Sequence, residues 1–154
     1  WLAGCEVEIQ CGKANIEVGY VGYTLPELDT IIIRRYVKPI SAGYKMKDSA
    51  VWIQPDHISY RLRGDTAEWT SKQKADQPFF SFESDYDYEV FIAAAGKTYL
   101  ITDIVEKETD IKVPLKLIGG VGYGCMNQVS QIRMNGAPAT LTNRHGRYII
   151  YLKK

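Results

Sequence analysis

Residues 85–104, DYDYEVFIAAAGKTYLITDI, carry the clearest strand pattern in the chain. Acidic and apolar residues alternate in the first half: the acids are Asp85, Asp87 and Glu89, and the apolar residues are Tyr86, Tyr88 and Val90. A period of two places the acids on one face of a half-buried strand and the apolar side chains on the other. Gly96-Lys97 then turns the chain into a second strand over 98–104, so this stretch predicts an antiparallel hairpin.

Further strands are expected on both sides of this hairpin. Residues 57–63 alternate in the same way, and Gly64-Asp65 suits a two-residue turn into 66–69. Residues 30–37 and 50–53 add two strands, and a last hairpin is expected between 130–134 and 147–152, beyond Asn135-Gly136. Amphipathic helices longer than about two turns are missing from the pattern. Seven to nine short strands indicate an all-β chain, an antiparallel sandwich or barrel.

The length, composition and charge of the chain exclude several classes of protein. The chain has 154 residues, 45% of them hydrophobic, which is enough for one domain with a real core. The formal net charge is +1, from 19 basic and 18 acidic residues. Nucleic acid is therefore not expected as a partner, because such binding usually rests on a clear basic surplus. No apolar run reaches the length needed to cross a bilayer.

The chain has three cysteines, Cys5, Cys11 and Cys125. The roles expected for them depend on how the N-terminal stretch WLAGC is interpreted. Leu2-Ala3-Gly4-Cys5 resembles the bacterial lipobox, in which the chain is cut before a cysteine that then carries a lipid. On this interpretation 1–4 are the remnant of a signal peptide, and 5–18 are a lipidated tether to a sandwich domain over 19–154. Cys11 and Cys125 then remain for a disulfide. The alternative is an accidental match in a cytosolic chain with three free thiols.

Three stretches resemble small envelope lipoproteins of Bacteroidetes bacteria: ELDTIIIRRY (27–36), CMNQVSQIRMNG (125–136) and RYIIYLKK (147–154). This resemblance implies a β-rich protein, lipid-anchored in the outer membrane or periplasm, and it implies no activity and no site residues. The segment MNGAPATLTNRHGRYII (134–150) is similar to the last hairpin of transthyretin-like and carboxypeptidase-regulatory domains. That similarity favours a sandwich of the immunoglobulin or transthyretin type.

Paired carboxylates are the main candidates for a metal site. Asp85, Asp87 and Glu89 share one strand face, and a second acidic group follows the next strand at 106, 108 and 110. If the two groups meet across the hairpin, they could hold Ca²⁺, which takes six to eight oxygen ligands. They could also act as an acid–base pair on a glycan. The alternative is a solvated face paired with lysines such as Lys97 or Lys107.

Other motifs give no catalytic constellation. The chain has two histidines, His57 and His145, and lacks H-E-x-x-H, C-x-x-C and G-x-S-x-G. GGVGYG (119–124) does not match the phosphate loop G-x-x-x-x-G-K-[ST], and the integrin-type tripeptide RGD at 63–65 is already explained by a turn. The aromatic residues Trp52, Tyr60 and Trp69 could form a sugar-stacking platform or part of the core.

The sequence as a whole predicts a non-catalytic binding or structural module with no cofactor. Its expected partners are the membrane, through the anchor, and an envelope protein or glycan. The alternative is a calcium-dependent glycan-binding protein, or a glycan-active enzyme, that uses the acidic strand faces.

Overall fold

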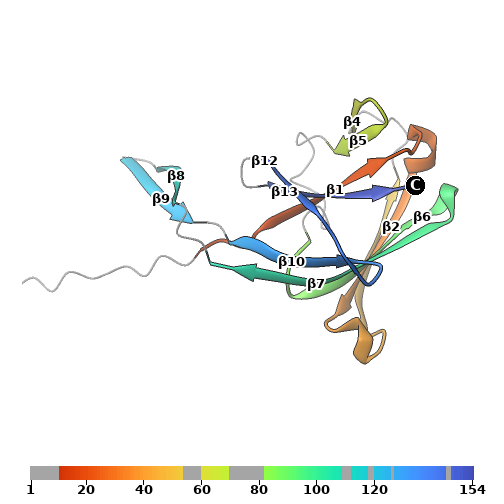
Figure 1. The fold of residues 1–154 in the computed structure, drawn as a ribbon, viewed down its shortest axis with the longest axis horizontal. Coiled ribbons are helices and arrows are strands. Elements are labelled where there is room, and N and C mark those ends of the chain that lie inside the picture. The colour runs from red at the N-terminus through yellow and green to blue at the C-terminus, as the bar shows by residue number, and fades with distance from the viewer. Residues whose placement is uncertain are drawn as a thin grey trace, which may run out of the picture.

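The computed structural model describes residues 11–53, 60–69, 82–108, 112–117, 120–125, 127–144 and 147–154 (Figure 1). These ranges contain thirteen β-strands and three short 3-10 helices, and they contain no α-helix. The prediction of an all-β chain is confirmed, although the strands outnumber the seven to nine expected, because strands also form at 112–117, 120–125, 137–138 and 141–144, where none was expected. In the same ranges, no helix combines the length and apolar character needed to span a membrane.

One sheet has five strands. Their order is β12 (Leu141–Arg144), β13 (Arg147–Lys153), β1 (Asn15–Val21), β5 (Thr66–Trp69) and β4 (Tyr60–Arg63). β1 and β13 are parallel, which departs from the all-antiparallel expectation, and the other pairs are antiparallel. The turn between β4 and β5 is the predicted one, because Gly64 takes a φ of 62° that glycine adopts without strain.

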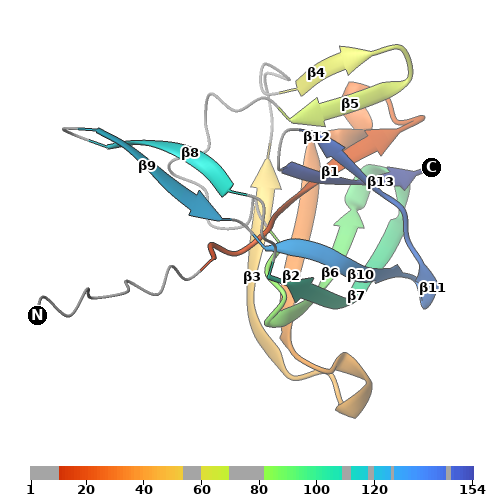
Figure 2. The ribbon, with the colours of Figure 1, turned by 60° about the vertical axis from the view of Figure 1, so that its left-hand side comes forward.

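The other sheet has six strands, all antiparallel. Their order is β11 (Ala137–Pro138), β10 (Gln128–Met134), β7 (Lys97–Lys107), β6 (Tyr86–Ile92), β2 (Thr30–Val37) and β3 (Met46–Ile53). The hairpin predicted from 85–104 is β6–β7, and its turn is the 3-10 helix η4 (Ala93–Ala95) followed by Gly96. Two further 3-10 helices, η1 (Leu25–Leu28) and η2 (Ile40–Ala42), connect strands. A separate hairpin, β8 (Lys112–Leu117) and β9 (Gly120–Cys125), projects away from both sheets (Figures 1 and 2).

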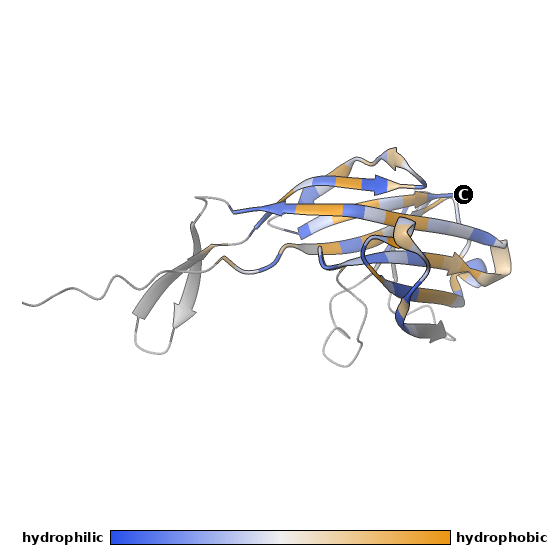
Figure 3. Cartoon of the chain, turned by 90° about the horizontal axis from the view of Figure 1, so that it is seen from below, coloured by the Kyte–Doolittle hydropathy of each residue, from blue (hydrophilic) through white to orange (hydrophobic). Residues whose placement is uncertain are grey.

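The two sheets share one hydrophobic core, because alternate side chains of strands such as β1, β6 and β13 point inward. Bands of apolar and polar residues alternate along the strands in Figure 3. The core residues of the five-stranded sheet are Ile16, Tyr20, Ala67, Tyr148, Ile150 and Leu152, and those of the six-stranded sheet are Ile31, Tyr88, Val90, Ile92, Tyr99, Ile101, Ile104 and Ile132. The intervening residues of β1, β5 and β13 therefore form the outer face of the five-stranded sheet.

Two expectations about chain organisation need correction. The last strand, β13, does not pair with β10: Asn135-Gly136 leads β10 into the short β11, whereas β13 pairs with β12 and β1 in the other sheet. The expected tether over 5–18 also extends too far into the chain. β1 begins at Asn15, and the Ile16 side chain is fully buried, so the last part of that range belongs to the fold.

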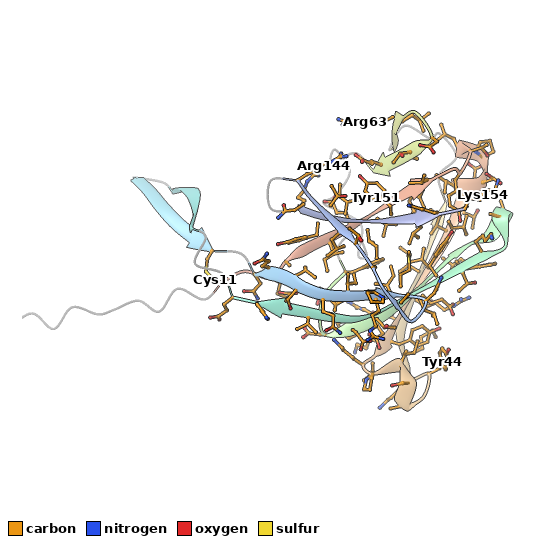
Figure 4. The ribbon with its side chains drawn as sticks, viewed as in Figure 1. Cys11, Tyr44, Arg63, Arg144, Tyr151 and Lys154 are labelled. Carbon is orange, nitrogen blue, oxygen red and sulfur yellow. A yellow bond between two sulfur atoms is a disulfide. The ribbon has the colours of Figure 1, made fainter. Side chains whose placement is uncertain are left out.

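Cys11 and Cys125 lie at disulfide distance, as predicted, with 1.97 Å between their sulfur atoms. The pair joins the chain ahead of β1 to the end of β9 (Figure 4). Backbone hydrogen bonds reinforce the junction, since the Gly12 N–H donates to the Cys125 carbonyl and the Asn127 N–H donates to the Gly12 carbonyl. Cys5, the predicted lipid-bearing residue, lies outside the described residues.

Candidate anion-binding groove

A shallow groove of about 230 Å³ lies on the outer face of the five-stranded sheet. All five strands contribute to it or border it, and its lining comprises Val21, Arg63, Thr66, Glu68, Arg144, Tyr151 and Lys153. Three of these residues are cationic at neutral pH and one is acidic, so the lining carries a net charge of 3 − 1 = +2. A surplus of positive charge in a concave site favours an anionic ligand.

Strand register places these residues in two rows across the sheet. In the first row, Gly19 on β1 lies opposite Tyr151 on β13 and opposite Glu68 on β5. In the second row, Val21 lies opposite Lys153 and Thr66, and Thr66 in turn lies opposite Arg63 on β4. The parallel pairing of β1 with β13 is thus what brings residues near the end of the chain beside the β4–β5 hairpin.

Gly19 allows the side chains of Tyr151 and Glu68 in the first row to meet across β1. A Cβ atom at this position would lie 2.6 Å from both Cδ1 and Cε1 of Tyr151, far inside normal contact distance. One edge of the tyrosine ring therefore passes directly over the glycine. Because no side chain intervenes, the Tyr151 hydroxyl crosses β1 and donates to Oε1 of Glu68 over 2.6 Å.

Arg144 completes a network with these two residues. Its Nη1 donates to Glu68 Oε2 over 2.8 Å, and its Nη2 donates to the Tyr151 hydroxyl oxygen over 3.2 Å. Both oxygens of Glu68 are thus occupied, and its side chain is only 13% exposed. Burial, followed by the bond to Glu68, raises the pKa of Tyr151 above its ordinary value of 10.0, so the hydroxyl remains a protonated donor near neutral pH.

Arg63 and Lys153 are the two groove cations whose side chains are not engaged in the Glu68 network. Both side chains are exposed, and within the described part of the chain neither makes a hydrogen bond or an ion pair. The Lys153 backbone is nevertheless fixed, since its carbonyl accepts from the Tyr99 hydroxyl and the following Lys154 N–H donates to the Val21 carbonyl. Figure 4 shows Arg63, Arg144 and Tyr151 on the same side of the molecule.

The acidic face predicted as a calcium site has other partners. Asp85 pairs with Lys13, and Glu89 pairs with Arg34. Asp87 is not on a solvated face: it is 2% exposed and accepts a 2.8 Å hydrogen bond from the Ile40 N–H, because η2 covers this part of β6. Across the described ranges, no three His, Cys, Asp or Glu side chains converge in a way that could hold a metal ion.

The second acidic group is also dispersed. Glu106 accepts from the Ala14 N–H at 3.1 Å and from the Asn127 side-chain amide at 3.0 Å, both on Oε2. Glu108 is exposed, and Asp110 lies outside the described residues. Glu106 therefore helps to fix the junction near Cys11 and Cys125 instead of facing Asp87.

Several other predicted features are only partly described. His57, His145 and Gly119 fall outside the described residues, as do the side chains of Trp52, Tyr60 and Trp69, and the rest of GGVGYG belongs to β9. Arg63, singled out in the sequence as part of an RGD tripeptide, lines the groove instead. Glu68, Arg144 and Tyr151 were missed by the sequence reasoning. A signal existed in the polar positions that alternate with apolar ones on β5 and β13, but only the strand order shows that they meet.

Comparison with protein-family models, curated proteins and solved structures finds no match for this chain.

Proposed function

We propose that this chain is a non-catalytic binding module whose ligand site is the groove on the outer face of the five-stranded sheet, and that the ligand carries negative charge. The observation that carries the proposal is the pair of exposed, uncommitted cations, Arg63 and Lys153, that line the groove beside Arg144. Arginine and lysine are the usual donors to carboxylate, phosphate and sulfate groups.

A binding role is favoured over a catalytic one by the state of the groups in the groove. Glu68 is hydrogen-bonded through both oxygens to Tyr151 and Arg144, so it offers no free carboxylate for proton transfer. Tyr151 has a raised pKa and stays neutral, which makes it a weak nucleophile and a weak base. The network is suited to holding side chains in place.

We also propose that the module is lipid-anchored at Cys5 in the bacterial envelope, with an envelope protein or glycan as partner. The lipobox-like LAGC supports the anchor, and the Cys11–Cys125 pair agrees with an oxidising compartment. The shared core between the two sheets supports the finer description as a sandwich of the transthyretin or immunoglobulin type. The mass of protein purified from membranes tests the anchor: a diacylglycerol on Cys5 is expected, and an unlipidated chain would exclude it.

Thermal melting in a panel of anions tests the binding proposal. Carboxylates, sugar acids, phosphate and sulfate are compared with chloride at matched ionic strength, since a ligand of the native state must raise the melting temperature. We expect at least one anion to raise the melting temperature of the wild type and of Lys97→Ala, which lacks an exposed lysine on the other sheet. The double variant Arg63→Ala/Lys153→Ala should lose the rise. The groove would be excluded as the site if no anion raised the melting temperature of the wild type. It would also be excluded if the rise were equal in Lys97→Ala and in Arg63→Ala/Lys153→Ala.

A further inference from the structure

We propose that the anionic ligand is an acidic sugar of the hexuronate type, a pyranose ring bearing one carboxylate. This inference rests on the anion-binding function proposed for the same groove. It is carried by the combination of an aromatic ring, an aliphatic side chain and two uncommitted cations in one small concavity.

The aromatic part of the groove suits a sugar ring. Tyr151 is held over Gly19 by its bonds to Glu68 and Arg144, so the ring is positioned before any ligand arrives. Val21 lies beside it in the lining. The C–H groups on one face of a pyranose pack against such a ring, and a preorganised aromatic side chain loses little conformational freedom on binding. An inorganic anion would leave this apolar surface unused.

The charged part of the groove suits a single carboxylate. Arg63, at one end of the second row, is the exposed guanidinium assigned to that carboxylate, and Lys153, at the other end, adds positive charge to the groove. A guanidinium donates two parallel hydrogen bonds to a carboxylate. Arg144, by contrast, already directs both terminal nitrogens at Glu68 and Tyr151 and contributes mainly its charge.

The size of the groove limits the ligand. Pockets for drug-sized ligands measure about 300–1,000 Å³, whereas this groove measures about 230 Å³. A single sugar residue, free or at the end of a longer glycan, matches that scale. The Thr66 hydroxyl donates its hydrogen to Asp65, so both lone pairs of its oxygen can accept hydrogen bonds from sugar hydroxyls.

Calorimetric titration with glucuronate, glucose and inorganic phosphate tests the inference. For the wild type and Lys97→Ala, we expect glucuronate to bind more tightly than either other compound. Arg63→Ala should weaken glucuronate binding by at least about tenfold, because losing one charge-assisted hydrogen bond already costs about that factor and the guanidinium donates two. Tyr151→Phe keeps the ring but removes the bonds that hold it in place, so it should bind glucuronate more weakly than the wild type and more tightly than Tyr151→Ala, which should lose the affinity.

The other outcomes separate this inference from the proposed function. If phosphate binds as tightly as glucuronate and Tyr151→Ala has no effect, the groove is a plain anion site and the sugar assignment is wrong. If glucose binds as tightly as glucuronate, the carboxylate is not recognised and the assignment is equally wrong. If neither these compounds nor the wider anion panel binds, the proposed function fails together with the inference.

Discussion

Replacing Gly19 with alanine tests whether the groove depends on the lack of a side chain at this position, which lets the Tyr151 ring lie over β1. The new Cβ would lie 2.6 Å from two atoms of the Tyr151 ring, whereas favourable carbon–carbon separations are about 3.5–4.0 Å. β1 is hydrogen-bonded to β13 on one side and to β5 on the other, so its backbone has little room to retreat. The tyrosine ring must therefore move, and its hydroxyl must leave the 2.6 Å hydrogen bond to Glu68.

The expected cost follows from three terms. Forcing extra atoms into a packed site typically costs about 1–3 kcal/mol. Losing a hydrogen bond to a charged group costs about 1.5–3 kcal/mol, but only part of that applies here because Tyr151 is half-buried and water can replace Glu68. Alanine regains about 0.5–1 kcal/mol over glycine in a strand. We expect a net destabilisation of about 1–3 kcal/mol, a fall in melting temperature of roughly 2–4 °C per kcal/mol for a chain of this size.

A double-mutant cycle with Tyr151→Ala assigns that cost to the ring. In the Tyr151→Ala background, Gly19→Ala should cost less than about 0.5 kcal/mol, because the atoms it meets are gone. Melting curves of the four proteins measure the cycle, and Gly19→Ala alone should also weaken glucuronate binding. Equal costs of Gly19→Ala in both backgrounds would refute the reasoning, since the strain would then arise elsewhere, for example against Ile149.

Three other predictions concern features away from the groove. Replacing both Cys11 and Cys125 with serine removes a link between residues 114 positions apart. The chain-entropy model values such a link at up to about 4–5 kcal/mol, so the denaturation midpoint should fall. An unchanged midpoint would mean that the disulfide does not form. The hydrogen bond from Lys154, followed by that from the Thr24 N–H, lowers the pKa of Glu27 from 4.5 to about 2; ionised Glu27 therefore stabilises the fold above about pH 4.5, and this contribution is lost as the pH falls toward 2. A carboxyl NMR titration should show a midpoint near 2 that rises in Lys154→Ala, and a midpoint near 4.5 would exclude the contact. Replacing EDTA by calcium should leave the melting temperature unchanged, because Asp85, Asp87 and Glu89 have separate partners; a rise would restore the calcium site.

The local elements of this fold could be predicted because they depend on near neighbours in the sequence. The alternation at 85–91 and the turn at Gly64-Asp65 each specify a strand or a hairpin without reference to the rest of the chain. The β13 strand was also expected near its observed position, yet its partner was not. Pairing of β13 with β1 joins residues more than a hundred positions apart, and no local pattern encodes such a contact.

The candidate site was harder to predict for the same reason. Arg144 and Tyr151 lie on the consecutive strands β12 and β13, and they reach Glu68 on β5 only because β1 lies between β13 and β5 in the sheet. The acidic residues at 85, 87 and 89, by contrast, are visible in the sequence as a cluster, but their partners come from elsewhere: Lys13, Arg34 and the η2 backbone. A charge pattern on one strand does not reveal which charges the neighbouring segments bring to it.

Chemical-shift mapping of the backbone amides during a glucuronate titration tests the central claim most directly. The groove account predicts that the largest shifts fall on Gly19, Val21, Thr66, Glu68 and Lys153, on three adjacent strands of one sheet. The chemical shifts of the Asp85, Asp87 and Glu89 amides, on the other sheet, should not change. Shifts confined to that acidic face, or none at saturating glucuronate, would contradict the assignment of the groove as the binding site.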